Sequence, residues 1–334
     1  MEPRVSVLIP ARDAEATLAT ALRSVARQRE TRFECVVVDD GSLDRTREVA
    51  LQFAAADPRF RVVAAARAGL VLALNRGLAA CRAPFVARMD ADDWMHRERL
   101  SAQLRLLDDD PSLCCVGCHV RLFPRRGLRP GLRAYERWLC SIDSPERVRR
   151  DAFIECPLAH PTLVIRREEL LELGFRDAGW PEDYDLLLRL LAKGLRIGVV
   201  PRRLLGWRDS AGRLSRTHPS YAQRRFTECK AAFLASGFLA GREEYVLWGY
   251  GATGRALRRA LVRHGKRPSH IVELHPGRVG QRIHGAPVIA PSALPALRGR
   301  PIVVSVAGEG PRAEIRVALA AMEFQELNEF VCAA

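Results

Sequence analysis

Apolar runs of strand length alternate with amphipathic stretches through the first 120 residues. The apolar runs predict four buried strands, over residues 5–9, 34–39, 61–66 and 84–89. The amphipathic stretches predict three helices, over residues 14–28, 42–56 and 70–81. We expect Ser42 to cap the second of these helices. Continuous apolar strands separated by helices are typical of an α/β fold, in which a mostly parallel sheet is covered by helices.

The pattern changes at residue 121 and again near residue 240. Residues 121–150 carry nine Arg against three acidic residues, with Pro and Gly between them. Order returns at Pro181, which suits the first turn of a helix that ends near Gly194. From residue 244 a strand, a glycine turn and a helix follow one another. We therefore predict a large α/β domain over residues 1–240, with a basic insertion at 121–150, and a small α/β domain over 241–334.

The net charge of +14 is high for a globular protein. Such a charge favours a phosphate-bearing partner, an anionic substrate or a membrane surface. Lys193, Lys230 and Lys266 are the only lysines among 53 basic residues. A preference for Arg of this kind also arises from the codon bias of a genome, so the charge alone does not choose the partner.

Several features predict a cytoplasmic protein. No apolar run approaches the roughly 18–20 residues that span a bilayer, so we expect no transmembrane segment, and peripheral membrane contact stays open. The N-terminus lacks the layout of a signal peptide. Nine cysteines without regular spacing favour a reducing compartment. The densest group, CCVGCH at residues 114–119, has no second ligand pair at zinc spacing and is better explained as a buried strand.

Acidic residues follow two of the predicted strands. Asp39 and Asp40 come after the second strand, and Asp90, Asp92 and Asp93 come after the fourth. The carboxyl ends of parallel strands meet at one edge of a sheet, where ligands bind, so we expect these carboxylates to share one cleft. Mg²⁺ and Mn²⁺ prefer carboxylates together with the phosphates of a substrate. The alternative is a polar loop with a helix-capping Asp.

Five blocks of sequence follow one another in a specific order. They are VSVLIPARD, VVVDDGSLDRT, ALNRGLAACRAPFVARMDADDWMHRERLSAQ, CPLAHPTLVIRR and GWPEDYDLLLRL. Together they resemble family 2 glycosyltransferases of the GT-A fold, over roughly residues 4–215. The resemblance implies an enzyme that moves a sugar from a nucleotide-diphosphate donor, with UDP as the expected nucleotide, to an acceptor hydroxyl.

The resemblance assigns roles to individual residues. It implies that Asp40 contacts the base of the nucleotide, that Asp90 faces the ribose, and that Asp92 binds Mg²⁺ or Mn²⁺ in a DXD motif. It implies that Asp183 is the general base, with Glu182 beside it, and that the reaction inverts the anomeric carbon. The other expected donor-binding residues are Pro10, Arg12, Asn75 and Arg88.

This chain departs from the family pattern at several positions. Arg12 stands where many relatives have an aromatic or polar residue, and Leu74 stands where a basic residue is frequent, so Arg67, Arg76 or Arg88 would contact the pyrophosphate. His218 is a candidate metal ligand, although a lone His is more often structural. His160 and Trp180 are candidate residues on the acceptor side.

The C-terminal segment carries Gly249, Gly251 and Gly254 between a strand and a helix, followed by Glu273 near the end of the next strand. This is the layout of a nucleotide-binding loop, although glycines at these positions also serve tight packing of a helix on a strand. The segment resembles the small Rossmann-like N-terminal domains of sugar O-acyltransferases. Bound NAD, another nucleotide or a sugar ligand, and a structural or acceptor-docking role all stay open.

The layout of the whole chain is similar to that of the animal family 2 enzymes that galactosylate queuosine in tRNA. If the likeness extends to function, the Arg-rich segment 121–150 and the basic tail over 241–334 would bind tRNA phosphates. The candidate residues within the segment are Arg125, Arg126, Arg129 and Arg133. Most relatives instead transfer sugars to saccharide or lipid-linked acceptors in envelope polysaccharide synthesis. A non-catalytic nucleotide-sugar-binding protein is a further class, but it predicts loss of the base, and Asp183 is present. A nucleotidyltransferase would show a Gly- and Lys/Arg-rich signature after the first strand, which PARDAEA lacks.

Overall fold

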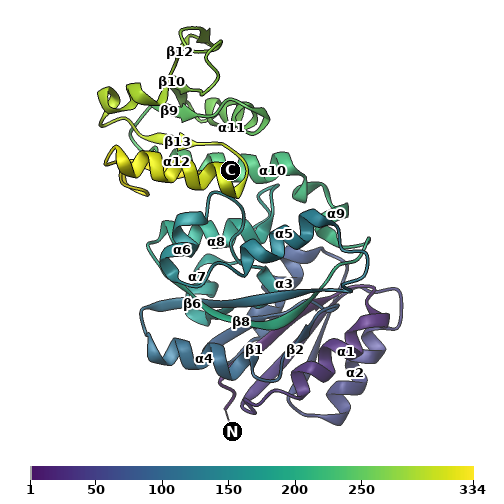
Figure 1. Cartoon of the computed structure of the whole chain (residues 1–334). Coiled ribbons are helices and arrows are strands. Elements are labelled where there is room, and N and C mark those ends of the chain that lie inside the picture. The colour runs from purple at the N-terminus through teal and green to yellow at the C-terminus, as the bar shows by residue number, and fades with distance from the viewer. Residues whose placement is uncertain (1) are drawn as a thin grey trace. The chain divides into compact units, whose positions relative to one another are not determined.

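The computed structural model describes residues 2–334, and the chain packs as two compact units. Unit 1 contains the residues up to Val148, together with Pro157–Ala178 and Asp185–Arg213. Unit 2 contains Arg149–Cys156, Gly179–Tyr184 and Leu214–Ala334. The predicted domain boundary at residue 240 stays a prediction. Figure 1 shows each unit as a sheet with helices packed against it.

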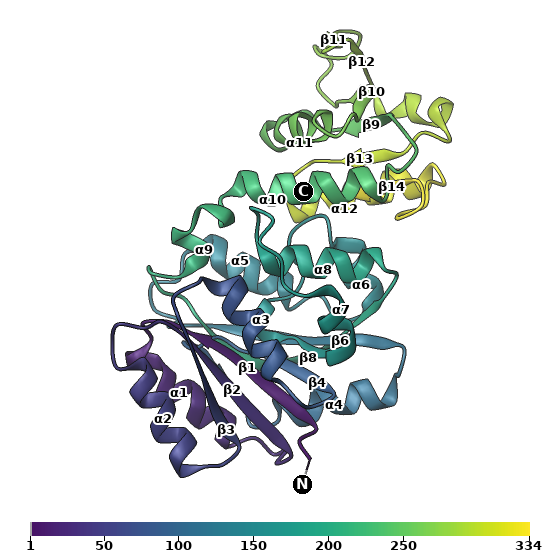
Figure 2. The ribbon, with the colours of Figure 1, turned by 180° about the vertical axis from the view of Figure 1, so that it is seen from behind.

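Unit 1 is built on an eight-stranded sheet with the order β3-β2-β1-β4-β7-β6-β8-β5. The first four strands in sequence are parallel to one another, and β1 pairs with both β2 and β4. Figures 1 and 2 show β1 and β2 side by side. The strands span Val5–Ala11 (β1), Phe33–Asp40 (β2), Phe60–Ala65 (β3), Phe85–Arg88 (β4), Trp94–Met95 (β5), Leu113–Phe123 (β6), Val164–Arg166 (β7) and Arg196–Arg208 (β8).

Helices cover both faces of this sheet, as the sequence predicts. Val7 and Ile9 of β1 share a core with buried residues of α1 and α4, whereas Leu8 points to the other face and packs near Gly77 of α3. The helices span Glu15–Ala26 (α1), Thr46–Ala56 (α2), Leu70–Ala80 (α3), Arg99–Asp109 (α4), Pro130–Leu139 (α5), Pro145–Asp151 (α6), Arg167–Leu173 (α7) and Glu182–Ala192 (α8). The division between the units falls within α6 and α8.

The predicted cap of α2 is wrong. The helix begins at Thr46, four residues after Ser42. The Ser42 hydroxyl instead accepts a hydrogen bond from the backbone N–H of Asp13 at 3.1 Å, and the Asp44 carboxylate accepts one from the Thr46 N–H at 2.9 Å. Residues 41–45 form a turn tied to the loop after β1, and this long-range contact sets the start of the helix.

The cysteine-rich run 114–119 lies in β6, as expected for a buried strand. Cys114, Cys115 and Cys118 are buried and free. Burial raises the pKa of the Cys118 thiol to about 11 and that of Cys114 to about 12. These thiols are therefore protonated at neutral pH and behave as small apolar side chains.

Unit 2 is built on a six-stranded sheet with the order β11-β12-β10-β9-β13-β14. The strands span Glu244–Trp248 (β9), Arg267–Val272 (β10), Arg282–Ile283 (β11), Ala286–Ile289 (β12), Ile302–Val304 (β13) and Phe330–Cys332 (β14). The helices span Leu214–Thr217 (α9), Gln223–Ser236 (α10), Ala252–Val262 (α11) and Glu309–Ala321 (α12). Short 3₁₀ turns cover His160–Thr162 in unit 1, and Pro219–Tyr221 and Pro291–Leu297 in unit 2.

The central strand of the unit 2 sheet divides two cores. Tyr245 and Leu247 of β9 pack with buried residues of α10 and α11, whereas Val246 and Trp248 pack with residues of α12 on the opposite face. Strand β9 pairs in parallel with β10 on one side and with β13 on the other. Successive strands are therefore added first on one side of β9 and then on the other. In parallel α/β sheets, a crevice opens at the carboxyl edge where the strand order switches in this way.

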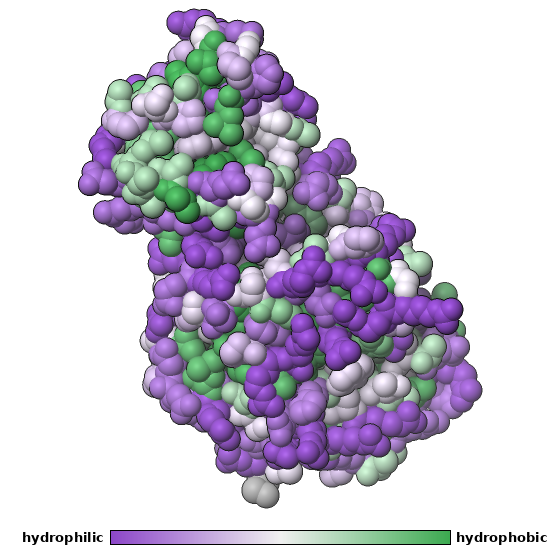
Figure 3. Space-filling view, viewed as in Figure 1, coloured by the Kyte–Doolittle hydropathy of each residue, from purple (hydrophilic) through white to green (hydrophobic). Residues whose placement is uncertain are grey.

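Hydrophilic side chains dominate the face of unit 1 seen in Figure 3.

No helix in the described part of the chain combines the length and the apolar character that a bilayer-spanning segment requires.

Candidate active site

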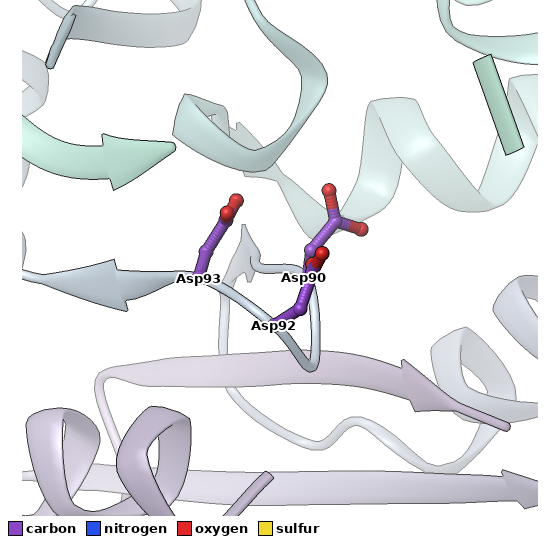
Figure 4. Close-up of side chains that lie close together, drawn as sticks. All are labelled: Asp90, Asp92 and Asp93. Carbon is purple, nitrogen blue, oxygen red and sulfur yellow. The ribbon is translucent and has the colours of Figure 1, made fainter. Parts of the chain in front are cut away.

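Three aspartates form a tight acidic turn after β4. One carboxylate oxygen from each of Asp90, Asp92 and Asp93 can be chosen so that all three lie within 4.8 Å of one another. Figure 4 shows the three carboxylates rising from the turn to the same side. The Arg88 guanidinium contacts the Asp90 carboxylate at 2.7 Å, from the end of the preceding strand. The acidic turn therefore brings together the residues that the DADD spacing predicted to meet.

The electrostatics of the acidic turn favour a cation. Burial, and then repulsion from Asp90, raises the pKa of the Asp92 carboxyl. Burial also raises the pKa of Asp93 well above its usual value, and the charges on Asp90 and Asp92 add to the effect. Like charges this close disfavour ionisation unless a positive charge lies among them.

Only one of the two carboxylate oxygens of Asp93 has a hydrogen-bond partner among the described residues. Its side chain is 1% exposed, and its Oδ1 accepts a hydrogen bond from the Arg208 N–H at 2.8 Å. Its Oδ2 has no hydrogen-bond partner among the described residues. Arg208 also donates from Nε to the Asp92 carbonyl oxygen at 2.7 Å, so that β8 fixes the shape of the turn. A buried oxygen without a partner, next to two further carboxylates, suits a hard divalent cation.

Arg88 is a buried cation beside the acidic turn. It is 4% exposed, and its Nε and Nη1 have no hydrogen-bond partner among the described residues. Its carbonyl oxygen accepts a hydrogen bond from the fully buried Arg99 at 2.9 Å. Gln103 accepts a further bond from Arg99 and donates to the carbonyls of Val116 and Thr162. This network fixes the end of β4 and leaves Arg88 with donors to spare for an anion.

His160 lies in the same part of unit 1. It is 5% exposed, and its ring is 5.6 Å from that of Phe175. Burial, together with the positive charge of Arg88, lowers the pKa of His160 well below its usual value. The imidazole is therefore neutral at pH 7.

The predicted donor residues around β1 and β2 have well-defined contacts. The buried Asp40 carboxylate accepts hydrogen bonds from the N–H groups of Ala68, at 2.8 Å, and Gly69, at 3.0 Å. Arg12 Nη1 lies 3.7 Å from Asp40, whereas Pro10 is buried within β1.

The side-chain amide of Asn75 exchanges two hydrogen bonds of 2.9 Å with the backbone of Phe175. This pairing favours a positioning role for Asn75. Its contact with a donor stays a prediction.

The predicted base segment lies at the start of α8, in the part assigned to unit 2. Glu182 is 6% exposed, and its carboxylate accepts a hydrogen bond from the Tyr221 hydroxyl at 2.6 Å. Asp183 is half-buried, and its carboxylate accepts a hydrogen bond from the Tyr184 N–H at 2.7 Å. Trp180, just before the helix, is half-buried. His218 is exposed and accepts a hydrogen bond from the Ser220 N–H through Nδ1, at 3.4 Å.

The basic segment divides into two kinds of arginine. Arg125 contacts the buried carboxylate of Glu136, and Arg133 donates to the carbonyl oxygens of Leu128, at 3.3 Å, and Arg125, at 3.1 Å. These two side chains hold the loop before α5. All four side chains are exposed, but Arg125 and Arg133 are engaged in these contacts, so Arg126 and Arg129 are better placed to bind a polyanion.

The glycine loop of unit 2 serves packing at two of its three glycines. A Cβ on Gly249, which has a φ of +95°, would lie 2.4 Å from Val306, and one on Gly254 would lie 2.1 Å from the Gly249 carbonyl oxygen. A Cβ on Gly251 would meet nothing within 4 Å. The Glu273 carboxylate accepts a hydrogen bond from the Tyr250 N–H at 2.9 Å and therefore closes the loop itself.

Substitution of these glycines by Ala should show which of them the packing of the loop requires. We expect Gly254→Ala to destabilise the protein by about 1–3 kcal/mol, because the new methyl group must displace backbone. Gly251→Ala should change stability by no more than about 0.5 kcal/mol, because its Cβ points into open space. Urea unfolding followed by fluorescence measures both. Equal midpoints for the two variants would contradict the packing role of Gly254.

The sequence of this chain matches a known protein family. The family model "Glycosyl transferase family 2" matches residues 6–174, half of the chain. The chain belongs to glycosyl transferase family 2.

Among curated relatives, the putative glycosyltransferase EpsE of Bacillus subtilis is 27% identical over 66% of this chain and 78% of EpsE. The amylovoran biosynthesis glycosyltransferase AmsE of Erwinia amylovora is 28% identical, over 67% of this chain and 84% of AmsE. The putative glycosyltransferase EpsH of B. subtilis is 33% identical, but over only 33% of this chain and 32% of EpsH.

Solved structures show the same fold. TarS 1–349 of S. aureus in complex with UDP-GlcNAc matches with a TM-score of 0.55 and 20% identity, over 79% of this chain and 72% of that chain. The mannosyltransferase PcManGT of Pyrobaculum calidifontis, in complex with GDP-Man and Mn²⁺, matches with a TM-score of 0.54 and 17% identity, over 97% and 82% of the two chains. The predicted GT-A fold is therefore confirmed, and unit 2 adds a second sheet.

Sequence reasoning missed Arg208 and Tyr221. Arg208 lies 115 positions after Asp93, at the end of β8, and no local spacing connects the two residues. Tyr221 lies 39 positions after Glu182 in a short 3₁₀ turn. Both contacts depend on how distant segments pack, which a local pattern does not record.

Proposed function

We propose that this glycosyltransferase is inverting and metal-dependent, and that it transfers a hexose from a UDP-sugar to an acceptor hydroxyl. The observation that carries the proposal is the acidic turn, where three carboxylates meet, one of them with a buried oxygen that lacks a partner among the described residues. The family and the fold support the reaction class.

The donor set of the acidic turn fits Mg²⁺ or Mn²⁺. Asp92 would hold the ion, and Asp90 and Asp93 lie close enough to supply further oxygens. When bound, such an ion neutralises the charge that develops on a departing diphosphate. His218 stays a candidate further ligand. No other group of three or more metal-ligating side chains was found among residues 2–334.

The residues of unit 1 would bind the donor. Arg88 has buried guanidinium nitrogens without partners among the described residues, which suits a diphosphate oxygen. Asp40 orders the loop at Ala68 and Gly69, and its carboxylate would contact the nucleotide base. Arg12 lies beside Asp40 and would stack on that base.

Asp183 would act as the general base. Its carboxylate would accept the proton of the acceptor hydroxyl while that oxygen forms a bond to the anomeric carbon, and the bond from that carbon to the diphosphate breaks. Glu182 is bound by Tyr221 and buried, so it would position Asp183 and not accept the proton.

The proposed acceptor is a saccharide or a lipid-linked sugar of an envelope polysaccharide. The relative AmsE, whose name assigns it to amylovoran biosynthesis, supports this acceptor class. The test offers the full-length enzyme a panel of labelled UDP-sugars, first with a lipid and glycan extract and then with total tRNA. Label in the glycan or lipid fraction supports the proposal, and label only in tRNA overturns it.

A modified nucleoside in tRNA is the second candidate acceptor, because Arg126 and Arg129 are exposed and have charge available for phosphates. If tRNA is the acceptor, Arg126→Ser together with Arg129→Ser should weaken tRNA binding and lower its salt dependence. Gel shifts over a series of salt concentrations measure this. The matched control is Arg105→Ser, an exposed arginine of α4 that lies outside the basic segment. Unchanged binding in the double variant would exclude this segment as the tRNA-binding surface.

A further inference from the structure

Two short segments from the first 190 residues belong to unit 2. They are Arg149–Cys156 and Gly179–Tyr184, and the second carries the proposed base, Asp183. The residues that follow from Leu214 onward make up the rest of unit 2. The proposed base is therefore grouped with the C-terminal sheet and its helices.

Charged side chains of unit 2 anchor the first segment. Arg316 of α12 contacts the buried Asp151 carboxylate at 2.7 Å. Burial opposes ionisation of Asp151, but hydrogen bonds from Arg150 and Arg316 outweigh it and lower the pKa of that carboxyl. Lys230 of α10 donates from Nζ to the Ile154 carbonyl oxygen at 3.0 Å. The same Nζ donates to the carbonyl oxygen of Ala333, next to the last residue, at 2.6 Å.

Two tyrosine hydroxyls then secure the base segment. Tyr184 is fully buried and donates to the Ala152 carbonyl oxygen at 2.7 Å, which connects the two short segments. Its ring lies 5.9 Å from that of Phe226 in α10. Tyr221 donates to the Glu182 carboxylate at 2.6 Å. Asp183 therefore stands between two residues whose side chains are fixed within unit 2.

We propose that unit 2 positions the general base, and that the hydroxyls of Tyr184 and Tyr221 are its positioning contacts. This inference rests on the proposed role of Asp183. A base must lie within hydrogen-bond reach of the proton that it accepts, and a displacement of about 1 Å costs about 10²-fold in rate. Unit 2 thus takes part in the reaction through the segment that it holds, whether or not its glycine loop binds a ligand.

The test compares three substitutions of Tyr by Phe in the full-length protein. Tyr184→Phe and Tyr221→Phe each remove one positioning hydroxyl. The matched control is Tyr245→Phe, because Tyr245 is also buried in unit 2 but its hydroxyl has no hydrogen-bond partner among the described residues. We expect kcat to fall at least 10-fold in the first two variants. The KM for the UDP-sugar and its calorimetric Kd should stay within 2-fold of the parent, and the control should retain full activity.

The outcomes separate this inference from the proposed function. An unchanged kcat in both Tyr184→Phe and Tyr221→Phe, with Asp183→Asn inactive, would overturn the positioning role and leave the base in place. Equal losses in kcat and in donor affinity would also overturn it, since they indicate a general structural effect. Normal transfer by Asp183→Asn would instead overturn the proposed base. If Tyr184→Phe lowers the thermal midpoint, the half-buried Tyr221 provides the deciding variant.

Discussion

Asp183→Asn is expected to bind UDP-sugar as tightly as the parent and to transfer sugar about 10²- to 10⁴-fold more slowly. The amide keeps the size of the carboxylate, and its oxygen can still accept the hydrogen bond from the Tyr184 N–H. It cannot take up the proton of an acceptor hydroxyl. The loss should therefore appear in kcat, and the affinity for the donor should not change.

The measurement combines initial rates of transfer with calorimetry of UDP binding. Asp109→Asn is a suitable control, since Asp109 is an exposed carboxylate at the end of α4. If Asp183→Asn turns over at the parental rate, another group accepts the proton. Glu182 would then be the first residue to examine, although its bond from Tyr221 argues against that role.

The alternation of apolar strands and amphipathic helices predicted the N-terminal half of the fold well. Strands β1 to β4 and helices α1 to α3 lie within a few residues of their predicted positions. Each is specified by a local period, and right-handed connections between parallel strands leave few alternative arrangements. The end of β4 therefore follows from sequence, and with it the place of the acidic turn.

The middle of the sheet could not be predicted in the same way. Strand β7 has three residues, runs antiparallel to both β4 and β6, and lies between them. Its position depends on the pairing of Val86 with Ile165, 79 residues further along the chain, which no local pattern encodes. The same holds for Arg208, whose backbone N–H reaches Asp93 from the end of β8.

The glycine loop shows why a motif does not by itself give a function. The spacing of Gly249, Gly251 and Gly254 correctly predicts a strand, a turn and a helix. Glu273, which would bind a ribose in a dinucleotide site, accepts a hydrogen bond from the loop and contacts Arg278 at 3.3 Å. The open space beside Gly251 is the one feature of the three glycines that packing does not explain and that a ligand could use. The sequence alone does not show that space.

Asp92→Ala is expected to abolish metal-dependent binding of UDP. Loss of an outer partner of a metal ligand costs about 10- to 100-fold in affinity, and loss of a ligand should cost more. The substitution removes one of three adjacent carboxylates, and burial and repulsion already raise the pKa of Asp92. Without metal, the variant should therefore be at least as stable as the parent, because repulsion within the turn is relieved.

Calorimetry with UDP in the presence of Mn²⁺, and again with EDTA, tests the role of Asp92. The parent should bind tightly only with Mn²⁺, whereas Asp92→Ala should bind weakly in both solutions. Asp109→Asn, which changes a carboxylate outside the acidic turn, should behave like the parent. Equal affinity of the parent and Asp92→Ala in Mn²⁺ would show that Asp92 does not hold the ion. The carboxylates of Asp90 and Asp93 would then have to supply the ligands, with Arg88 competing for Asp90.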